Sequence, residues 1–303
     1  MKLPQAIIAI LIIIISASFF ILPKYRQDFP FTKTIQKVNI NDLSKLDPYP
    51  VTISNFESAP TLSAVAATVI DNKTGVTLFE KNPDLKRLPA STTKLMTALV
   101  ALEHCLPQTV IKVGYVEQEG TKMGLAVGDE VIVESLLYGL LVPSGNDAAF
   151  VLAYSCANSY QGFIADMNKK AKDLGMVNTH FANPAGFDSN LQYSTARDLT
   201  KLSRAAVANP LISKIVATRS IVVTDVSGTK TYYLENVNKL LGKVFGVEGV
   251  KTGQTEGSLE NLVAKATRDG NTIVTVVLGS QDRFGETTQL IQWAFKNHKW
   301  INP

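Results

Sequence analysis

Short β-prone runs lie near both ends of the sequence and come in pairs. They predict strands over residues 64–70, 76–79, 220–224, 231–234, 262–267 and 272–278. The first pair is joined by Asp71-Asn72-Lys73-Thr74-Gly75 and the last by Arg268-Asp269-Gly270-Asn271, and both connections have the composition of a hairpin turn. The pattern therefore predicts one β-hairpin near each end of the folded part.

Apolar residues between these strands recur at the three- and four-residue spacing of amphipathic helices. The spacing predicts helices over residues 95–106, 131–141, 147–174 with a break, and 196–208, and a last helix follows at 287–296. Helices enclosed by strands at both ends favour one α+β domain, in which the N-terminal hairpin joins the C-terminal strands in one sheet.

The first sixty residues have a different character. Residues 6–22 carry no charge and follow a short start with Lys2, a pattern typical of an export signal or a membrane span. We expect residues 1–26 to be a signal peptide or N-terminal membrane anchor, residues 27–60 a linker, and residues 61–303 the folded domain. A retained anchor is favoured over cleavage near Ser16-Ala17-Ser18, because the segment stays apolar as far as Leu22. The domain would then lie outside the cytoplasm, held at the cell membrane, or be secreted if the signal is cleaved.

Composition limits the classes of function. A hydrophobic content of 46% in 303 residues is sufficient for a sizeable core. Much of the formal charge of +4 comes from Lys2, Lys24 and Arg26 beside the apolar segment, so no nucleic-acid surface is indicated. The three histidines lack metal-ligand spacing, so we expect no metal site and no cofactor: His104, His180 and His298.

The two cysteines, Cys105 and Cys156, each fall in a segment with helical apolar spacing. We expect two small buried thiols rather than a disulfide, although spacing alone leaves their pairing open. Neither is expected to be catalytic.

The first candidate for chemistry is Ser91-Thr92-Thr93-Lys94, at the start of a predicted helix. A spacing of three places the Ser91 hydroxyl and the Lys94 amine on one helical face. A serine hydroxyl becomes a nucleophile when a base removes its proton, and a neutral lysine can be that base. A free lysine has a pKa of ~10.4, so this role requires the pKa to fall to about 7, which burial plus a second nearby cation can achieve.

The same pattern recurs at Ser227-Gly228-Thr229-Lys230. This copy lies in a glycine-containing turn between two predicted strands, where a three-residue spacing does not align side chains as a helix does. We therefore favour Ser91 and Lys94.

Two further motifs follow along the chain. Ser144-Gly145-Asn146 precedes a long predicted helix, where Ser144, Asn146 or Asp147 could also cap the N-terminus. Lys251-Thr252-Gly253 precedes the last two predicted strands, and its ammonium would lower the pKa of Lys94 and attract an anionic substrate. A second copy, Lys73-Thr74-Gly75, lies in the first hairpin turn, ahead of the serine motif in the chain.

The ordered set Ser91-x-x-Lys94, Ser144-x-Asn146 and Lys251-Thr252-Gly253 resembles the active-site motifs of penicillin-binding proteins and serine β-lactamases. Flanking stretches are most similar to the low-molecular-mass D-alanyl-D-alanine carboxypeptidases, over about residues 64–295. They include Phe181-Ala182-Asn183-Pro184-Ala185-Gly186. The resemblance implies a β-lactamase/transpeptidase-like α+β fold, with an antiparallel sheet of N- and C-terminal strands packed against helices and a mostly helical subdomain.

The same resemblance implies a serine-type D-Ala-D-Ala carboxypeptidase. Such an enzyme removes the terminal D-alanine from peptidoglycan stem peptides through an acyl-enzyme, and β-lactam antibiotics acylate it. Ser91 would be the nucleophile and Lys94 its base. Ser144 and Lys251 would relay a proton to the leaving D-alanine, and Asn146 would hydrogen-bond the substrate amide.

The resemblance also assigns substrate-binding residues. The backbone N–H groups of Ser91 and Gln254 would form the oxyanion hole. Thr252 and Arg283 would bind the terminal carboxylate, because a guanidinium can grip a carboxylate with two hydrogen bonds. Gly253 would let the substrate backbone lie against the strand. For Arg283 a solvated surface charge remains the alternative.

Two features depart from the family pattern. Leu259 stands where the family usually has glycine, in Glu256-Gly257-Ser258-Leu259, so we expect a reshaped entry to the following strand. Many relatives add a β-rich domain and a membrane-binding helix, whereas this sequence ends at Pro303, which favours the retained N-terminal anchor.

Two rival functions have weaker support. A class A β-lactamase needs a glutamate with asparagine four residues on, and neither Glu235 nor Glu248, between the second and third motifs, has one. A non-catalytic wall-binding protein would not need the complete set of five catalytic side chains. Carboxypeptidases and endopeptidases share this sequence pattern, because both cleave the D-Ala carbonyl through the same acyl-enzyme.

Overall fold

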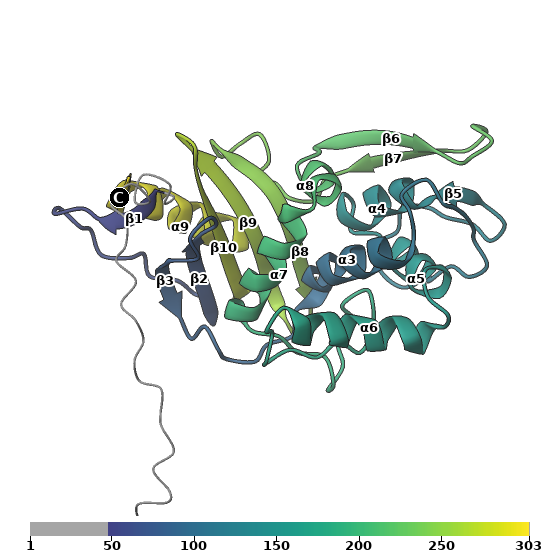
Figure 1. Ribbon diagram of the computed structural model, residues 1–303, viewed down its shortest axis with the longest axis horizontal. Helices are drawn as coiled ribbons and strands as arrows, with labels where there is room; N and C mark the ends of the chain where they lie inside the picture. Colours follow the sequence, from purple (N-terminus) through teal and green to yellow (C-terminus); the bar gives the residue numbers. More distant parts are fainter. Residues whose placement is uncertain (1–47, 303) are drawn as a thin grey trace, which may run out of the picture. The chain divides into compact units, whose positions relative to one another are not determined.

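A five-stranded antiparallel sheet organises residues 48–302, the part of the chain that the computed structural model describes (Figure 1). In spatial order its strands are β3 (Thr77–Lys81), β2 (Ala66–Asp71), β10 (Asn271–Ser280), β9 (Leu259–Arg268) and β8 (Val247–Thr255). The predicted pairing of the N-terminal hairpin with the C-terminal strands is confirmed by the contact of β2 with β10. Strand β8 adds an edge to this sheet, and it contains Lys251-Thr252-Gly253.

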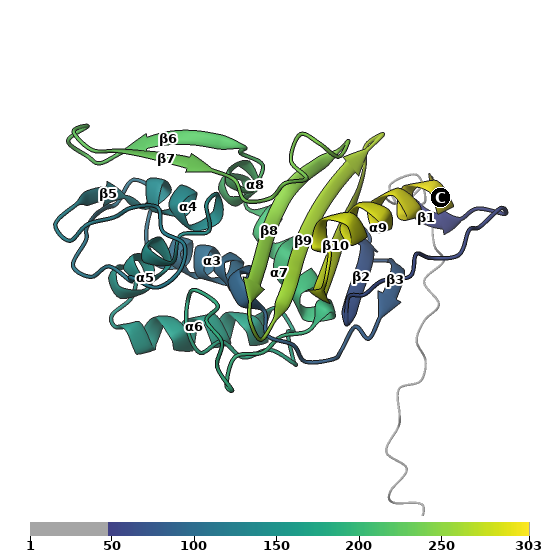
Figure 2. The same ribbon diagram turned by 180° about the vertical axis from the view of Figure 1, so that it is seen from behind.

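Both faces of the sheet are covered by helices. Helix α7 (Ala196–Ala208) packs on one face and α9 (Arg283–Asn297) on the other, as Figure 2 shows from behind. Side chains along a strand alternate between the faces, so Ala66 and Ile70 of β2 join the core on the α7 side, and Ala67 and Val69 join the core on the α9 side. All six residues of β2 are therefore buried.

The middle of the chain forms a mostly helical subdomain beside the β8 edge. It contains α3 (Lys94–His104), α4 (Val133–Leu141), α5 (Asn146–Ser155), α6 (Tyr160–Asp173) and α8 (Pro210–Val216), with the two-stranded sheets β4 (Val110–Lys112) with β5 (Glu130–Ile132) and β6 (Ser220–Thr224) with β7 (Thr231–Glu235). The predicted break within residues 147–174 is confirmed between α5 and α6. Most helices lie between the N-terminal and C-terminal strands along the chain, so the expected α+β fold class is confirmed.

One expected boundary is wrong. Strand β1 (Tyr49–Thr52) pairs with β11 (His298–Ile301), within the stretch that we expected to be linker. The Trp293 indole also donates to the Glu57 carbonyl at 2.9 Å. The packed domain thus begins before residue 61, because a short strand from a Pro-rich stretch finds its partner at the far end of the chain.

The expectations for residues 1–47 lie outside the described residues. The signal peptide or anchor over residues 1–26 and the first part of the linker therefore stay predictions. Within residues 48–302, no helix combines the length and the apolar character that crossing a membrane requires.

The expectation of two free thiols is also wrong, because Cys105 and Cys156 form a disulfide with their Cα atoms 5.5 Å apart. Cys105 ends helix α3 and Cys156 ends helix α5. These helices pack against each other and bring their C-terminal ends together. Sequence spacing showed two helical segments but not that they end side by side. A disulfide of this kind is typical of proteins that fold in an oxidising compartment.

The disulfide closes a loop with a sequence separation of 51 residues. Replacing both cysteines by serine should lower the free energy of unfolding by about 4 kcal/mol, because the unfolded chain regains the entropy that the cross-link removed. Urea unfolding of the oxidised wild type and of the double variant measures this difference, and the reduced wild type is the matched control. Equal midpoints for the oxidised wild type and the variant would contradict the prediction.

Candidate active site

Ser91 lies in a 3-10 turn, η2 (Ala90–Thr93), that runs directly into α3. The Lys94 amine donates to Ser91 Oγ at 2.8 Å and to the Ala185 carbonyl at 2.7 Å. Lys94 is fully buried, whereas Ser91 is partly exposed. The predicted meeting of this serine and this lysine is confirmed.

The electrostatic surroundings of Lys94 disfavour a charged amine. Burial is the largest cause that lowers the pKa of Lys94 well below 10.5, and the positive charge of Lys251 lowers the pKa further. The carboxylate of Asp147 acts in the opposite direction and is the smallest of the three effects. The expectation that Lys251 lowers the pKa of Lys94 is confirmed in direction.

The backbone just before the nucleophile is tightly constrained. Ala90 adopts a φ of 48°, a left-handed conformation that costs energy for a residue with a Cβ. A Cβ on Gly186 would lie 1.9 Å from the Ala90 carbonyl oxygen, and one on Gly253 would lie 3.1 Å from the Ser91 nitrogen. Position 186 requires glycine for this approach, and glycine at 253 leaves room for β8 to approach the Ser91 turn closely.

The loop that carries Ala185 is ordered by one side chain. Asn183 Oδ1 accepts hydrogen bonds from the backbone N–H groups of Ala185, Gly186 and Phe187 at 3.2, 2.7 and 3.0 Å. Its Nδ2 donates to the Phe187 carbonyl at 3.0 Å. This stretch belongs to the family resemblance, which implied no role for it. The structure gives it one, since the loop presents the carbonyl that fixes the Lys94 amine.

Ser144 and Lys251 form the second pair of the site. The Lys251 amine donates to Ser144 Oγ at 2.8 Å and to the Thr252 carbonyl at 3.0 Å. Ser144 has a φ of 70°, so a strained backbone presents its hydroxyl to the strand. Burial and then the positive charge of Arg283 lower the pKa of Lys251 to about 7. The hydroxyl therefore faces an amine that can exchange a proton near neutral pH.

Asn146 lies at the first position of α5, and one hydrogen bond holds its side chain. Its Nδ2 donates to the Glu119 carbonyl at 2.9 Å. The structure records no partner for its Oδ1 among residues 48–302. That oxygen is therefore free to accept a hydrogen bond from a substrate amide.

Asp147 has a role that sequence analysis missed. We considered Ser144, Asn146 and Asp147 as helix caps, but the N-cap of α5 is Gly145, without a side-chain hydrogen bond. The buried carboxylate of Asp147 instead accepts from the backbone N–H groups of Met123, Gly124 and Leu125, 24 to 22 residues earlier in the chain. It thereby fixes the loop that also holds Asn146. Only its place directly after the Ser-x-Asn motif could have marked it in the sequence.

Arg283 lies at the start of α9 and points to β8. Its Nη1 donates to the Gly253 carbonyl at 3.0 Å and to Gln254 Oε1 at 3.1 Å. Burial lowers the pKa of Arg283, which is half-buried, and Glu260 opposes this effect. The alternative of a solvated surface charge is therefore wrong. Thr252, the residue before Gly253 in β8, is buried.

The second copies of the serine and lysine motifs, at residues 227–230 and 73–75, are here called the decoy motifs. Both lie in turns, and neither forms a catalytic site. In the β6–β7 turn, Ser227 Oγ donates to Asp225, and the Lys230 amine donates to Asp129 at 2.5 Å. In the β2–β3 turn, Thr74 donates to Asp71. The geometry therefore agrees with the choice of Ser91 with Lys94 and of the later Lys-Thr-Gly motif.

Leu259 opens β9, and the reshaped strand entry that we expected relative to glycine stays a prediction. It adopts a φ of 58°, the left-handed conformation in which glycine is usual, and its side chain is 46% exposed. Strands β8 and β9 stay paired up to Thr255 opposite Leu259. The leucine therefore takes the backbone conformation of a glycine at the cost of local strain.

Comparisons with known proteins agree with this geometry. A family model described as D-alanyl-D-alanine carboxypeptidase, of the peptidase S11 family, matches residues 53–282. The D-alanyl-D-alanine carboxypeptidase of Streptomyces sp. strain K15 is 36% identical over 257 residues, which cover 78% of this chain and 88% of that protein. The D-alanyl-D-alanine endopeptidase of Escherichia coli K12 is 34% identical over 244 residues, 78% of each chain.

A solved structure has the same fold. The crystal structure of the Streptomyces K15 DD-transpeptidase superposes with a TM-score of 0.74 at 34% identity, over 79% of this chain and all of that chain. Some relatives are longer: the match to DacF of Bacillus subtilis strain 168 spans 63% of that protein, at 32% identity over 78% of this chain. This chain therefore belongs to the family of serine D-alanyl-D-alanine carboxypeptidases.

Proposed function

We propose that this chain removes the terminal D-alanine from peptidoglycan stem peptides through an acyl-enzyme on Ser91, and that β-lactam antibiotics acylate the same serine. The main support is one contact, the buried Lys94 amine 2.8 Å from Ser91 Oγ. A neutral lysine in this place is a base at the nucleophile.

Acylation begins with proton transfer from Ser91 Oγ to the Lys94 amine. The oxygen then attacks the carbonyl carbon of the D-Ala–D-Ala amide, and the carbonyl oxygen becomes an oxyanion. The N–H groups of Ser91 and Gln254 would stabilise this charge, and such a donor is typically worth about 3 to 4 kcal/mol. The edge position of β8 supports this role, because an extended stem peptide can pair with a free strand edge.

Collapse of the tetrahedral intermediate breaks the carbon–nitrogen bond. The leaving nitrogen needs a proton, and Ser144 Oγ can deliver one while it receives another from the Lys251 amine 2.8 Å away. Asn146 Oδ1 would hold the substrate amide during this step. The proton that Lys94 took from Ser91 passes through solvent to the Lys251 amine, which leaves Lys94 neutral again. Water then attacks the ester carbonyl and gives a proton to Lys94. This proton returns to Ser91 Oγ as the ester bond breaks, and the shortened stem peptide leaves.

The terminal carboxylate of the substrate would be bound by Thr252 and Arg283. Arg283 already lies at the β8 edge through its contacts with Gly253 and Gln254. The guanidinium has further N–H groups for a carboxylate, including a buried Nε without a partner within residues 48–302.

The rival β-lactamase function has no structural support in the glutamates between the second and third motifs. Glu248 pairs with Lys265 at 2.7 Å, and Glu235 lies at the end of β7, so neither is placed beside Ser91 to activate a deacylating water. A non-catalytic wall-binding role would leave the buried lysine pair without a purpose. The relatives carry the names of both carboxypeptidases and an endopeptidase.

We further propose that the domain works on the extracytoplasmic side of the membrane. The disulfide supports an oxidising compartment. We also propose that residues 1–26 attach the domain to the membrane. Protease shaving of intact cells tests this, with detection of the domain in the membrane fraction or in the medium.

Ser91→Ala should abolish both covalent labelling by fluorescent penicillin and release of D-alanine from a peptide ending in D-Ala-D-Ala, because Ser91 Oγ is the only hydroxyl hydrogen-bonded to Lys94 within residues 48–302. Mass spectrometry of the penicillin adduct and a D-alanine assay measure the two effects. Ser227→Ala, in the decoy motif, is the matched control and should keep both activities. D-Alanine release by Ser91→Ala at the wild-type rate would contradict the proposed mechanism.

The rate of penicillin acylation should rise with pH through the lowered pKa of Lys94. Below that pKa the amine is protonated and cannot act as base, and above it the amine is neutral, so the acid limb should lie well below 10.5. Lys251→Gln removes one cause of the shift and should move the limb to higher pH. Stopped-flow measurement of the acylation rate across pH locates the acid limb of the wild type and that of Lys251→Gln. An acid limb near 10.5 in the wild type would show that Lys94 is charged.

Arg283→Gln should lower kcat/KM for a D-Ala-D-Ala peptide by about ten- to a hundredfold, the usual worth of a hydrogen-bonded charge. For the same peptide with an amidated C-terminus, the wild type and Arg283→Gln should have nearly equal kcat/KM, because that peptide has no carboxylate for Arg283 to bind. Arg268→Gln, at the far end of β9, is the control. Equal losses on both peptides would exclude carboxylate binding by Arg283.

A further inference from the structure

Five aromatic side chains from separate parts of the chain form one cluster beside the catalytic residues. Neighbouring rings in this cluster have their centroids 5.0 to 6.5 Å apart. At these separations the rings touch through edges and faces and cover one continuous area. We call this cluster the aromatic surface: Tyr115, Phe150, Tyr154, Tyr160 and Phe187.

The centre of the aromatic surface is buried and its outer part is open to solvent. Phe150 is 7% exposed, whereas Tyr154 is 49% and Tyr115 is 44% exposed. The mechanism above uses none of these rings. Core packing explains the buried ring, but exposed aromatic rings gathered in one place are typical of a binding surface.

Helix α5 connects the aromatic surface to the catalytic residues. Asn146, Phe150 and Tyr154 are spaced four residues apart and therefore lie along one side of this helix. At a rise of 1.5 Å per residue, Tyr154 lies ~12 Å from Asn146 along the helix axis. The aromatic surface thus begins one helical turn beyond the side chain that would hold the substrate amide.

The loop after Pro184 provides a second connection. A Cβ on Gly186 would lie 2.9 Å from the Ser91 nitrogen, so this loop touches the nucleophile turn. Phe187 is the next residue, and its ring centroid lies 5.8 Å from that of Phe150. One side of the aromatic surface is therefore in direct contact with the segment that borders Ser91.

Tyr115 belongs to a loop that Asn146 holds. Asn146 Nδ2 donates to the Glu119 carbonyl at 2.9 Å, and the Asn146 N–H donates to the Thr121 carbonyl at 2.7 Å. The Tyr115 ring centroid lies 5.3 Å from that of Tyr154. The exposed rings are thus tied to Asn146 through this loop as well as through α5.

The exposed part of the aromatic surface combines apolar faces with neutral hydrogen-bonding groups. The Tyr115 hydroxyl donates to the Glu117 carboxylate at 3.1 Å. Burial raises the pKa of Tyr160 to about 12, so this phenol is uncharged at neutral pH. A sugar ring has matching chemistry, because its C–H face can lie on an aromatic ring while its hydroxyls meet the phenols and the carboxylate.

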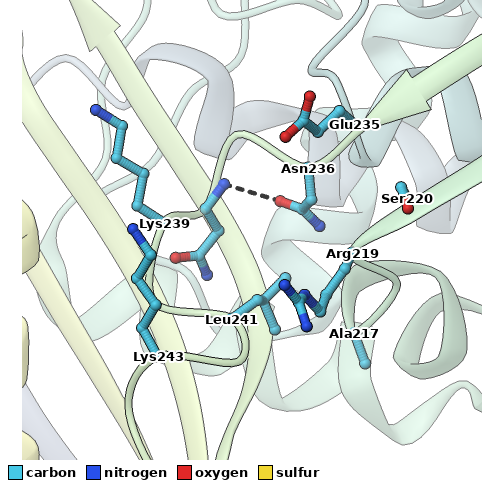
Figure 3. A pocket seen from close by; sticks show the side chains of 9 residues that line it. Ala217, Arg219, Ser220, Glu235, Asn236, Lys239, Leu241 and Lys243 are labelled. Atoms are coloured by element: carbon cyan, nitrogen blue, oxygen red, sulfur yellow. Dashed lines mark hydrogen bonds between the residues drawn. The ribbon is translucent and has the colours of Figure 1, made fainter.

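The pocket in Figure 3 has a different character. It has a volume of about 600 Å³ and is lined mainly by charged and polar side chains, among them Arg219, Lys239 and Lys243. Among the described residues, neither an aromatic ring nor a catalytic side chain lines it. Recognition of the substrate beyond its D-alanines is therefore better supported at the aromatic surface, which is in contact with the Ser91 loop.

We propose that the aromatic surface binds a pyranose ring of the glycan strand that carries the stem peptide. This inference rests on the proposed function and adds a sugar to the part of the substrate that is recognised. Four extended residues span at most about 14 Å. That length is close to the ~12 Å that separates Asn146 from Tyr154 along α5. A stem peptide held at Asn146 would therefore bring its sugar to the rings of Tyr154 and Tyr115.

The first test compares two substrates: a free stem peptide ending in D-Ala-D-Ala, and the same peptide attached to a disaccharide of N-acetylated sugars. In the full chain, Tyr154→Leu should raise KM for the disaccharide-peptide by about five- to tenfold, because it removes the aromatic face and keeps apolar bulk. KM for the free peptide and kcat for both substrates should stay within about twofold. Tyr154→Phe keeps the ring and should bind the disaccharide-peptide nearly as the wild type does.

Tyr233→Leu, at an 81% exposed tyrosine of β7, is the matched control and should change neither KM. Equal KM of the wild type and Tyr154→Leu for the disaccharide-peptide would overturn the proposal. A KM that rises equally for both substrates would also overturn it, because the ring would then contact the stem peptide and not the sugar. Failure of the wild type to release D-alanine from either substrate would instead overturn the proposed function.

Binding of the sugar alone separates the aromatic surface from catalysis. Saturation-transfer NMR with the peptide-free disaccharide and the Ser91→Ala chain should show transfer to C–H protons on one face of a sugar ring. Adding Tyr115→Leu and Tyr154→Leu should abolish this transfer. No transfer to the Ser91→Ala chain, or transfer that persists after both tyrosines are replaced, would overturn the assignment of the sugar to these rings.

Discussion

The structure depends on a lysine that must stay uncharged while it is fully enclosed by protein. Lys94 has no exposed surface, and its amine is shared between Ser91 Oγ and the Ala185 carbonyl. Both acceptors can pair with a neutral amine, so the buried group has hydrogen-bond partners without a carboxylate in contact. A contacting carboxylate would favour the charged form and remove the base.

Several strained or tightly packed features serve this arrangement. Ala90 and Ser144 adopt left-handed backbone conformations at two sides of the site, and Gly186 and Gly253 leave room for the close approach of their segments to the Ser91 turn. Asp147 fixes the loop over α5 through backbone N–H groups. The site therefore joins the edge strand β8, helix α3 and two loops, so that four separate parts of the chain must meet before the lysine is enclosed.

The sequence predicted the parts of this architecture that follow from local rules. Periodicity found the hairpins and most helices, and helical spacing separated Ser91 and Lys94 from the copy at Ser227. It could not find what depends on tertiary packing. The disulfide requires two helix ends to lie side by side, and β1 pairs with a strand some 250 residues away. The role of Ala185 depends on its backbone carbonyl, and that of Asp147 depends on backbone N–H groups. Backbone groups leave no pattern in the sequence.

The protonation state of Lys94 can be observed directly. NMR of the protein with ¹³C-labelled lysine, with the Lys94 signal assigned by its loss in Lys94→Arg, would follow the titration of this one amine. The account predicts a midpoint well below that of the exposed lysines, with the resting amine neutral when Lys251 carries the proton. A Lys94 signal that titrates together with the exposed lysines, near 10.5, would contradict it.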